Sequence, residues 1–371
     1  MAWLDLAVIA AYLSLVFAVN RYWASRVDFD GWLTSKGTIG WRFLMFTVVS
    51  TNVGAGTILG TAGSTYRAGI GWGLTSGVGA LLGYWLMAAF AGRIRRYTNA
   101  GERSSFQEFF RRRYSRSVQA AVGGVIAFLY FFYLAAQFKG LGAIFEVWAG
   151  METRVAGLVA ALLVIWLTAG AGIRSDMYTD VLHFWAMVVT IAAACVIEIA
   201  RLGGLGGLAT ALAAQPGGTA AALDPYAFGG ASYVWMGILV GSFLGLPSME
   251  VWQRVDAAKG ERDARRAFFW AGVLNAAFFT AAVLLGLVAR AALTGDIPKN
   301  QVLFRLLEHT LPPGLLGLAV VGAYAAFMST ANSMLMVAVA AILADLIYLK
   351  PDRLGRQRAI LGVTRRLTWG V

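Results

Sequence analysis

Charged residues are scarce in this 371-residue chain, where Asp, Glu, Lys and Arg together make up 13% of the sequence. A soluble domain of ordinary composition carries about 25%. Hydrophobic residues make up 59%, and the mean hydropathy is +0.66. This composition excludes an ordinary soluble protein and indicates a chain that lies within a membrane.

Cysteine and histidine are nearly absent, which removes two classes of chemistry. Because Cys195 is the one cysteine, the chain builds neither an internal disulfide nor a thiolate metal site. The two histidines, His183 and His309, are too far apart in sequence to form a ligand pair. No His-Glu-x-x-His motif occurs, and the carboxylates within apolar runs are too few for paired acid–base catalysis. We therefore expect no enzyme.

Apolar runs of membrane-spanning length recur along the chain. A helix needs about 20 residues to cross a hydrocarbon core of about 30 Å. Lipid offers no partner for free backbone groups, so such runs are predicted to be helices. They cover residues 3–19, 43–66, 71–90, 118–138, 155–171, 181–199, 232–246, 267–288 and 315–349. These nine runs predict an all-α membrane protein with one transmembrane domain over 1–371.

The net charge of +12 is distributed unevenly. If the N-terminus lies outside, most basic residues fall in inside loops; the exceptions are Arg67, Lys139, Arg154, Arg201, Arg290, Lys299 and Arg305. This asymmetry follows the positive-inside rule and predicts that orientation. A nucleic-acid interface would gather its basic residues on one surface, whereas these alternate between short loops. We expect a multi-pass protein of the inner or plasma membrane that binds no nucleic acid.

Three segments complete the predicted organisation. The first run lacks a basic leader and a convincing cleavage site, so it is interpreted as a retained helix. Residues 202–230 are rich in Gly and Ala and are predicted to form an external loop, with a short surface helix as an option. Residues 92–117 mix aromatics with arginines and are predicted to form an interfacial amphipathic segment.

The stretch "STNVGAGTILGTAGSTYRAG", residues 50–69, is apolar but weakens its own helix with Gly54, Gly56, Gly60 and Gly63. Each glycine in a helix interior costs about 1 kcal/mol relative to Ala. One explanation is close helix packing, because Gly56 and Gly60 form a GxxxG pair. The other explanation is a break in the helix.

The polar residues Ser50, Thr51 and Asn52 precede these glycines and favour the break. A helix that opens within the membrane frees backbone carbonyls, which are tolerated only where they line a cavity or bind something. Discontinuous helices of this kind bind sodium in many secondary transporters.

A second polar group lies in "AYAAFMSTANSMLMVAVAAILADLIY", residues 323–348. Ala326 and Ser329 are one helical turn apart, and Thr330 follows, so two hydroxyls and a carbonyl share one face. Sodium accepts such neutral oxygens. The alternative is that the hydroxyls bond back to the preceding turn while the alanines pack.

These two segments, with "YTDVLHF" (178–184) and "WQRVDAAKGERDARRA" (252–267), resemble the sodium:solute symporter family over nearly the whole chain. The "MSTANS" segment with the following Asp345 and Leu346 is the most specific part. The resemblance implies a LeuT-like inverted-repeat bundle. An extra helix (1–42) would precede core helices one to five (43–199) and six to eight (229–349).

The resemblance also implies a sodium site between the first and eighth core helices. Its ligands would be the carbonyls of Ser50, Val53 and Ala326 and the hydroxyls of Ser329 and Thr330. These include the oxygens that the two polar segments indicate by themselves. The implied substrate residues are Asn52, Gly54, Gly245 and Pro247, of which the last two interrupt the sixth core helix.

Asp180 matches a Thr-Asp pair that bears on sodium release in family members. The alternative is an exposed loop carboxylate near Arg174. The chain departs from the family by placing His183 where Gln is usual.

The function implied is sodium-coupled symport of a small organic solute by alternating access, with sodium as the ion required. Two alternatives stay open: the membrane module of a sensor histidine kinase, and an inactive truncated product. The chain stops at Val371, before the last two core helices, so a fragment of a longer protein is favoured. The sequence assigns neither the solute nor an oligomeric state.

Overall fold

The computed structural model describes residues 2–24, 37–99, 106–168 and 172–342, and within these ranges the chain is helical apart from turns and one β-bridge. In this described part of the chain, six helices are long and apolar enough to cross a membrane. They are α1 (Trp3–Ala24), α5 (Gly71–Asn99), α7 (Arg116–Ala149), α9 (Gly172–Arg201), α14 (Glu261–Ala292) and α16 (Leu315–Ala341). The all-helical membrane fold predicted from the apolar runs is therefore confirmed.

Two further spans are bent, which raises the number of membrane-crossing segments to as many as eight. In the first, α3 (Trp41–Asn52) is followed by a π-helical turn, η1 (Gly56–Gly60), and by α4 (Thr61–Ala68), with a bend of 61°. In the second, α12 (Gly230–Leu244) meets α13 (Met249–Ala257) at 46°. The shorter apolar helix α8 (Thr153–Thr168) accounts for the remaining predicted run.

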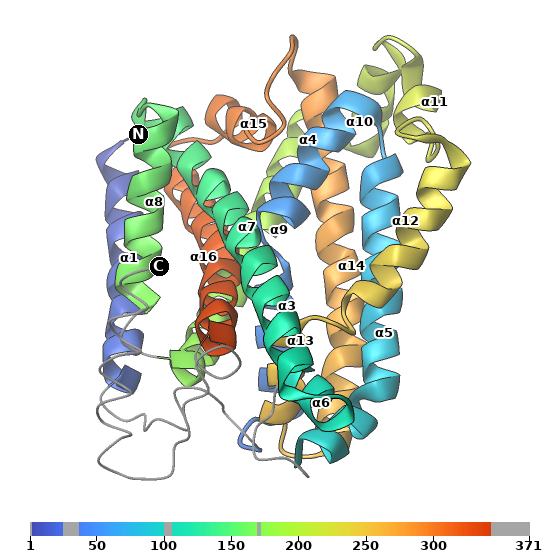
Figure 1. Ribbon diagram of the computed structural model, residues 1–371. Coiled ribbons are helices and arrows are strands. Elements are labelled where there is room, and N and C mark those ends of the chain that lie inside the picture. The colour runs from blue at the N-terminus through green and yellow to red at the C-terminus, as the bar shows by residue number, and fades with distance from the viewer. Residues whose placement is uncertain (1, 25–36, 100–105, 169–171, 343–371) are drawn as a thin grey trace.

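The core of the bundle surrounds α16. In its most apolar stretch 89% of the residues are buried, whereas the corresponding share in α1 is 17%. The helix packs against α9, α7, α1 and α3, while α5, α12 and α14 form the other side of the molecule (Figure 1). An apolar helix that is enclosed on all sides can carry hydroxyl groups only where they find partners. The polar residues of α16 are therefore candidates for a functional site.

Helix α7 is longer than the predicted run 118–138. It begins after Ser115, whose hydroxyl accepts a 3.3 Å hydrogen bond from the Val118 amide, and it ends before Gly150, which has a φ of 65°. The predicted run ended at Phe138 because polar and glycine residues follow. These glycines lie at close helix contacts, since a Cβ on Gly140 would be 2.7 Å from the Cβ of Ala55.

The connecting segments contain short helices. The predicted external loop 202–230 holds α10 (Gly204–Ala213) and α11 (Gly218–Leu223), and α15 (Val302–Thr310) precedes α16. The predicted interfacial segment 92–117 is divided, because its first part continues α5 and its last part forms α6 (Phe106–Arg113) and the start of α7. In α6 the side chain of Glu108 is buried beneath Arg111 and Arg112, to which it is ion-paired.

Candidate ion and substrate site

The first break is a local rearrangement of backbone hydrogen bonds. In an unbroken helix the Gly54 amide would donate to the Ser50 carbonyl. It donates instead to the Asn52 carbonyl at 3.0 Å, and α3 ends there. The Ser50 carbonyl therefore loses its helical donor within the membrane domain.

Helix α7 supports the next residue of the break. The Ala55 amide donates a 3.0 Å hydrogen bond to Oε1 of Gln137, and not to the Thr51 carbonyl as helical geometry would require. A second helical carbonyl is freed in this way. Gln137 is 5% exposed, so the bond lies inside the bundle.

The glycines of this segment have different roles. A Cβ on Gly54 would lie 2.7 Å from Oγ1 of Thr330 and 2.8 Å from Oε1 of Gln137, so only glycine fits between α7 and α16. A Cβ on Gly63 would lie 2.2 Å from the Lys299 carbonyl oxygen. At Gly56 and Gly60 no other helix lies within 4 Å of such an atom. The break is therefore confirmed, and close packing of another helix against the Gly56 and Gly60 pair is wrong as an explanation of these glycines.

The two hydroxyls predicted on α16 make different bonds. Thr330 Oγ1 donates to the Ala326 carbonyl at 3.1 Å, as the back-bonding alternative expects. The Ser329 hydroxyl donates instead to the carboxylate of Asp180 on α9. Both hydroxyl groups give their protons to neighbouring acceptors, which leaves their oxygen lone pairs available to a cation.

The break and α16 meet, because Gly54 lies directly against Thr330. Ser50 is fully buried, and its hydroxyl has no partner within the described part of the chain. Val53 ends α3 with a ψ of 79°, outside the helical region. A buried hydroxyl without a partner, beside carbonyls released from a helix, suits an oxygen-coordinated cation such as sodium.

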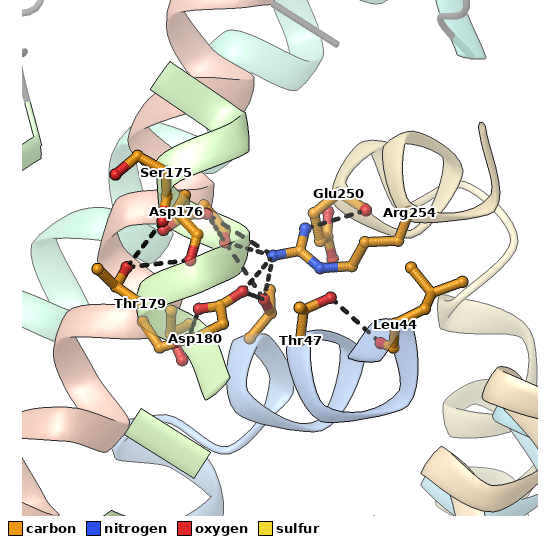
Figure 2. A network of polar contacts seen from close by, with 12 residues as sticks. Leu44, Thr47, Ser175, Asp176, Thr179, Asp180, Glu250 and Arg254 are labelled. Atoms are coloured by element: carbon orange, nitrogen blue, oxygen red, sulfur yellow. Dashed lines mark hydrogen bonds and ion pairs between the residues drawn. The ribbon is translucent and has the colours of Figure 1, made fainter. Parts of the chain in front are cut away.

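A buried ionic cluster lies beside these hydroxyls (Figure 2). Nη2 of Arg254 is 3.1 Å from Oδ2 of Asp180 and 3.7 Å from Oδ2 of Asp176, and the three side chains are at most 2% exposed. The same nitrogen donates to Ser333 at 2.7 Å and to the Thr51 hydroxyl. The cluster joins α3, α9, α13 and α16.

This cluster corrects two interpretations of the sequence. Asp180 is fully buried, so the alternative of an exposed loop carboxylate near Arg174 is wrong. The predicted orientation places Arg254 in an inside loop, but its side chain lies in the protein interior. His183 is also buried, and its Nδ1 shares a 2.5 Å hydrogen bond with the Tyr12 hydroxyl of α1.

Sequence reasoning missed four of the residues that form this region. Asp176 precedes Asp180 by one helical turn, so the shared face was visible in the spacing. Ser333 lies within the "MSTANS" segment itself, and Gln137 is a polar residue in an apolar run. Arg254 had no such signal, because it precedes the basic residues Lys259 and Arg262 and so resembles the start of a basic inside loop.

The predicted substrate residues are divided between the two bends. Asn52 is exposed beside the first break, and Gly54 lies against α16 as described. Gly245 caps the end of α12, and a Cβ there would lie 3.3 Å from Cγ of Met87 on α5. Pro247 is exposed in the connection between α12 and α13. Asp345 and Leu346, from the most specific part of the resemblance, lie outside the described residues.

Known proteins resemble this chain in sequence and in fold. The sodium/pantothenate symporter of Escherichia coli is 25% identical over 97% of the chain and 76% of its own length. The sodium/proline symporter of Staphylococcus aureus is 24% identical over 92% of the chain and 68% of its own length. The solved structure of a Na⁺-coupled sialic acid symporter superposes with a TM-score of 0.85. It is 17% identical, and the match covers 99% of this chain and 80% of that one.

The superposition shows the LeuT-like fold, with the bent spans among its helices. The model of the sodium:solute symporter family matches residues 32–368, which is most of the chain. The break, the hydroxyl-bearing α16 and the buried Asp180 all fall within that match. This protein belongs to the sodium:solute symporter family.

Proposed function

We propose that this protein imports a small organic solute together with sodium by alternating access. The observation that carries the proposal is the contact of Gly54, at the break in the first span, with Thr330 of α16. It supports a buried site in which the released backbone carbonyls would lie beside hydroxyl oxygens and bind sodium without a carboxylate ligand. The similarity to sodium/pantothenate and sodium/proline symporters supports the same activity.

The sodium ligands in this proposal are the carbonyls of Ser50, Val53 and Ala326 and the hydroxyls of Ser329 and Thr330. Sodium would bridge α3 and α16 and complete the binding pocket for the solute. The solute would bind beside Asn52 and Gly54 and reach the second bend at Gly245 and Pro247. Half-helix ends at both bends offer unpaired backbone groups for such contacts.

Asp180 is proposed to control sodium release. Its carboxylate accepts the Ser329 proton and so holds the Ser329 oxygen in one orientation. Movement of α9 relative to α16 would break this bond and weaken sodium binding. Low cytoplasmic sodium would then empty the site as one helix group rocks against the other.

The repeat organisation fits the same proposal. The predicted repeats 43–199 and 229–349 each begin with a bent span, α3–α4 and α12–α13. Two interrupted helices at corresponding positions are typical of inverted-repeat transporters. An inner or plasma membrane location with the N-terminus outside is proposed from the distribution of basic residues.

Direct sodium binding tests the proposal without knowledge of the solute. Binding of ²²Na⁺ to the purified full-length protein would be measured for the double variant Ser329→Ala, Thr330→Ala. We expect sodium affinity to fall at least about tenfold, because two of five oxygen ligands are removed. Thr190→Ala is the matched control, since this hydroxyl also joins α9 to α16 but bonds to the Leu318 carbonyl. Equal affinity in the double variant and the control would refute the ligand assignment.

A further inference from the structure

A groove between α7 and α8 lies apart from the proposed sodium site. Its volume is about 330 Å³, and its lining includes Phe138, Lys139 and Glu146 from α7 and Arg154 and Gly157 from α8. In Figure 1, α8 lies beside the upper part of α7, at the end of the bundle that carries the N-terminus. Two basic side chains and one carboxylate thus line a single cavity.

The two basic side chains have no partner among the residues that the structure describes. Lys139 and Arg154 are exposed, and neither forms a hydrogen bond or ion pair with another residue in the described part of the chain. Glu146 is half-buried, and one of its oxygens accepts a 3.2 Å hydrogen bond from Nε2 of Gln301. An unpaired cation on the outside of a membrane helix is costly unless it reaches the headgroups.

The adjoining ends of α7 and α8 place the groove at headgroup level. Arg116 begins α7 next to the basic end of α6, so this end lies at one membrane surface. At 1.5 Å per residue α7 is about 50 Å long, so its other end, where Glu146 lies in the last turn, reaches the opposite surface of a hydrocarbon core about 30 Å thick. Lys139 is about 10 Å nearer the membrane centre, two residues beyond Gln137, and its long side chain can extend toward that surface. Arg154 is in the first turn of α8 at the same end.

The surface that continues from the groove toward the membrane centre is apolar. Phe131 on α7 and Leu158 and Leu162 on α8 are all more than half exposed. A groove with charged walls at headgroup level, followed by an apolar surface, matches the shape and polarity of a phospholipid. A soluble anion would not use the apolar part.

We propose that this groove binds one phospholipid, with its phosphate between Lys139 and Arg154 and an ethanolamine ammonium group against Glu146. Two cations and a carboxylate complement a headgroup that carries one phosphate and one primary amine. A choline headgroup has no N–H to donate to Glu146, so phosphatidylethanolamine is the expected ligand. This site is independent of the sodium site and of the solute.

Native mass spectrometry of the delipidated full-length protein tests this proposal. The protein would be titrated with phosphatidylethanolamine, phosphatidylglycerol and phosphatidylcholine, and with inorganic phosphate as a competitor. Lys139→Gln and Arg154→Gln are each expected to weaken phosphatidylethanolamine binding about fivefold. Glu146→Gln is expected to abolish the preference for phosphatidylethanolamine over phosphatidylcholine. Lys139 and Arg154 are exposed and Glu146 is half-buried, so we expect the fold to be retained in all three variants, and a thermal unfolding scan verifies this.

Arg201→Gln is the matched control, because it removes an exposed cation from the end of α9 outside the groove. It is expected to leave phospholipid binding unchanged. Equal lipid binding by the wild type and by the Lys139 and Arg154 variants would overturn the proposal. Displacement of the lipid by millimolar inorganic phosphate alone would also overturn it, because the groove would then hold a free anion. So would a cross-link from Lys139→Cys to residues 343–371, because the chain itself would then fill the groove.

Discussion

Asp180 on α9 accepts a 3.1 Å hydrogen bond from Nη2 of Arg254 on α13, and both side chains are buried. Asp176 shares the same guanidinium, so the cluster holds two carboxylates for one cation. The attraction between charges is strong in this environment, and so is the cost of leaving one uncompensated. Arg254 therefore links the second bent span to α9 and α16 by electrostatics.

Replacing Arg254 with Gln is expected to destabilise the protein strongly. The substitution leaves Asp176 and Asp180 together without their cation, and breaking a buried pair costs about 3–5 kcal/mol. Adding Asp176→Asn should recover part of this loss, because one of the two uncompensated charges disappears. Thermal unfolding of the purified protein in detergent measures both effects.

Arg305→Gln is the control for this prediction. Arg305 pairs with Glu308 at 3.1 Å, but both side chains are at least 40% exposed. Exposed pairs contribute about 0–1 kcal/mol, so little change is expected. A loss in Arg254→Gln no larger than in Arg305→Gln would contradict the role of the cluster.

The helical spans could be predicted from the sequence because hydrophobic length is a local property. The break could be predicted for a related reason, since glycines and polar residues within an apolar run weaken a helix where they occur. Residues 50–69 therefore gave the right location. The role of each glycine could not be predicted. Thr330 and Gln137 leave no room for a Cβ on Gly54, and both are far away in sequence.

The ionic cluster is the part that the sequence did not reveal. In sequence Arg254 resembles a topology signal because it precedes the basic segment that starts at Lys259, and only packing of α13 against α3 and α16 turns its side chain inward. Asp176 and Asp180 share a helical face, but the periodicity of one helix does not identify its partner. Tertiary contacts between distant helices decide such pairs.

Asp5 is expected to stabilise the attachment of α1 to α16. Its carboxylate accepts hydrogen bonds from the amides of Gly314 at 2.6 Å and Gly317 at 2.7 Å, at the N-terminal end of α16. A carboxylate there satisfies free amides and complements the helix dipole. Asp5→Ala should lower the unfolding free energy by about 1–2 kcal/mol, measured by thermal unfolding.

The matched substitution for Asp5 is Asp224→Ala. Asp224 accepts a 2.8 Å hydrogen bond from the Tyr226 amide in an exposed turn. A hydrogen bond in an exposed turn contributes little to stability, so the unfolding temperature of Asp224→Ala should match that of the wild type. If the two variants were equally stable, Asp5 would not be anchoring α16.

Gln137 is expected to affect sodium binding through the backbone of the break. Gln137→Met keeps the side-chain length but removes the acceptor of the Ala55 amide, and an unpaired buried amide costs about 1–3 kcal/mol. The break would relax, and sodium affinity measured with ²²Na⁺ should fall about tenfold. Gln119→Met provides a comparison on the same helix, because Gln119 is equally buried but precedes Gln137 by five turns. Similar sodium affinities in Gln137→Met and Gln119→Met would argue against a role of Gln137 in supporting the break.

The substitution Gly54→Ala tests whether sodium binding depends on close packing at the break or on the flexibility that a glycine gives the span. The added methyl group would lie 2.7 Å from Thr330 Oγ1 and 2.8 Å from Gln137 Oε1, so α3 and α16 must move apart. Overpacking of this kind costs about 1–3 kcal/mol. Because the strain falls on a proposed sodium ligand, we expect ²²Na⁺ affinity to drop about tenfold or more.

Gly56→Ala is the control two residues away, since no atom lies within 4 Å of a Cβ added there. Both variants remove one glycine from the same broken span, so general helix propensity changes by a similar amount. Only Gly54→Ala forces Thr330 away from the break. Sodium affinity should therefore fall in Gly54→Ala and remain unchanged in Gly56→Ala. A parallel loss in both would mean that flexibility of the span, and not contact with α16, determines sodium binding.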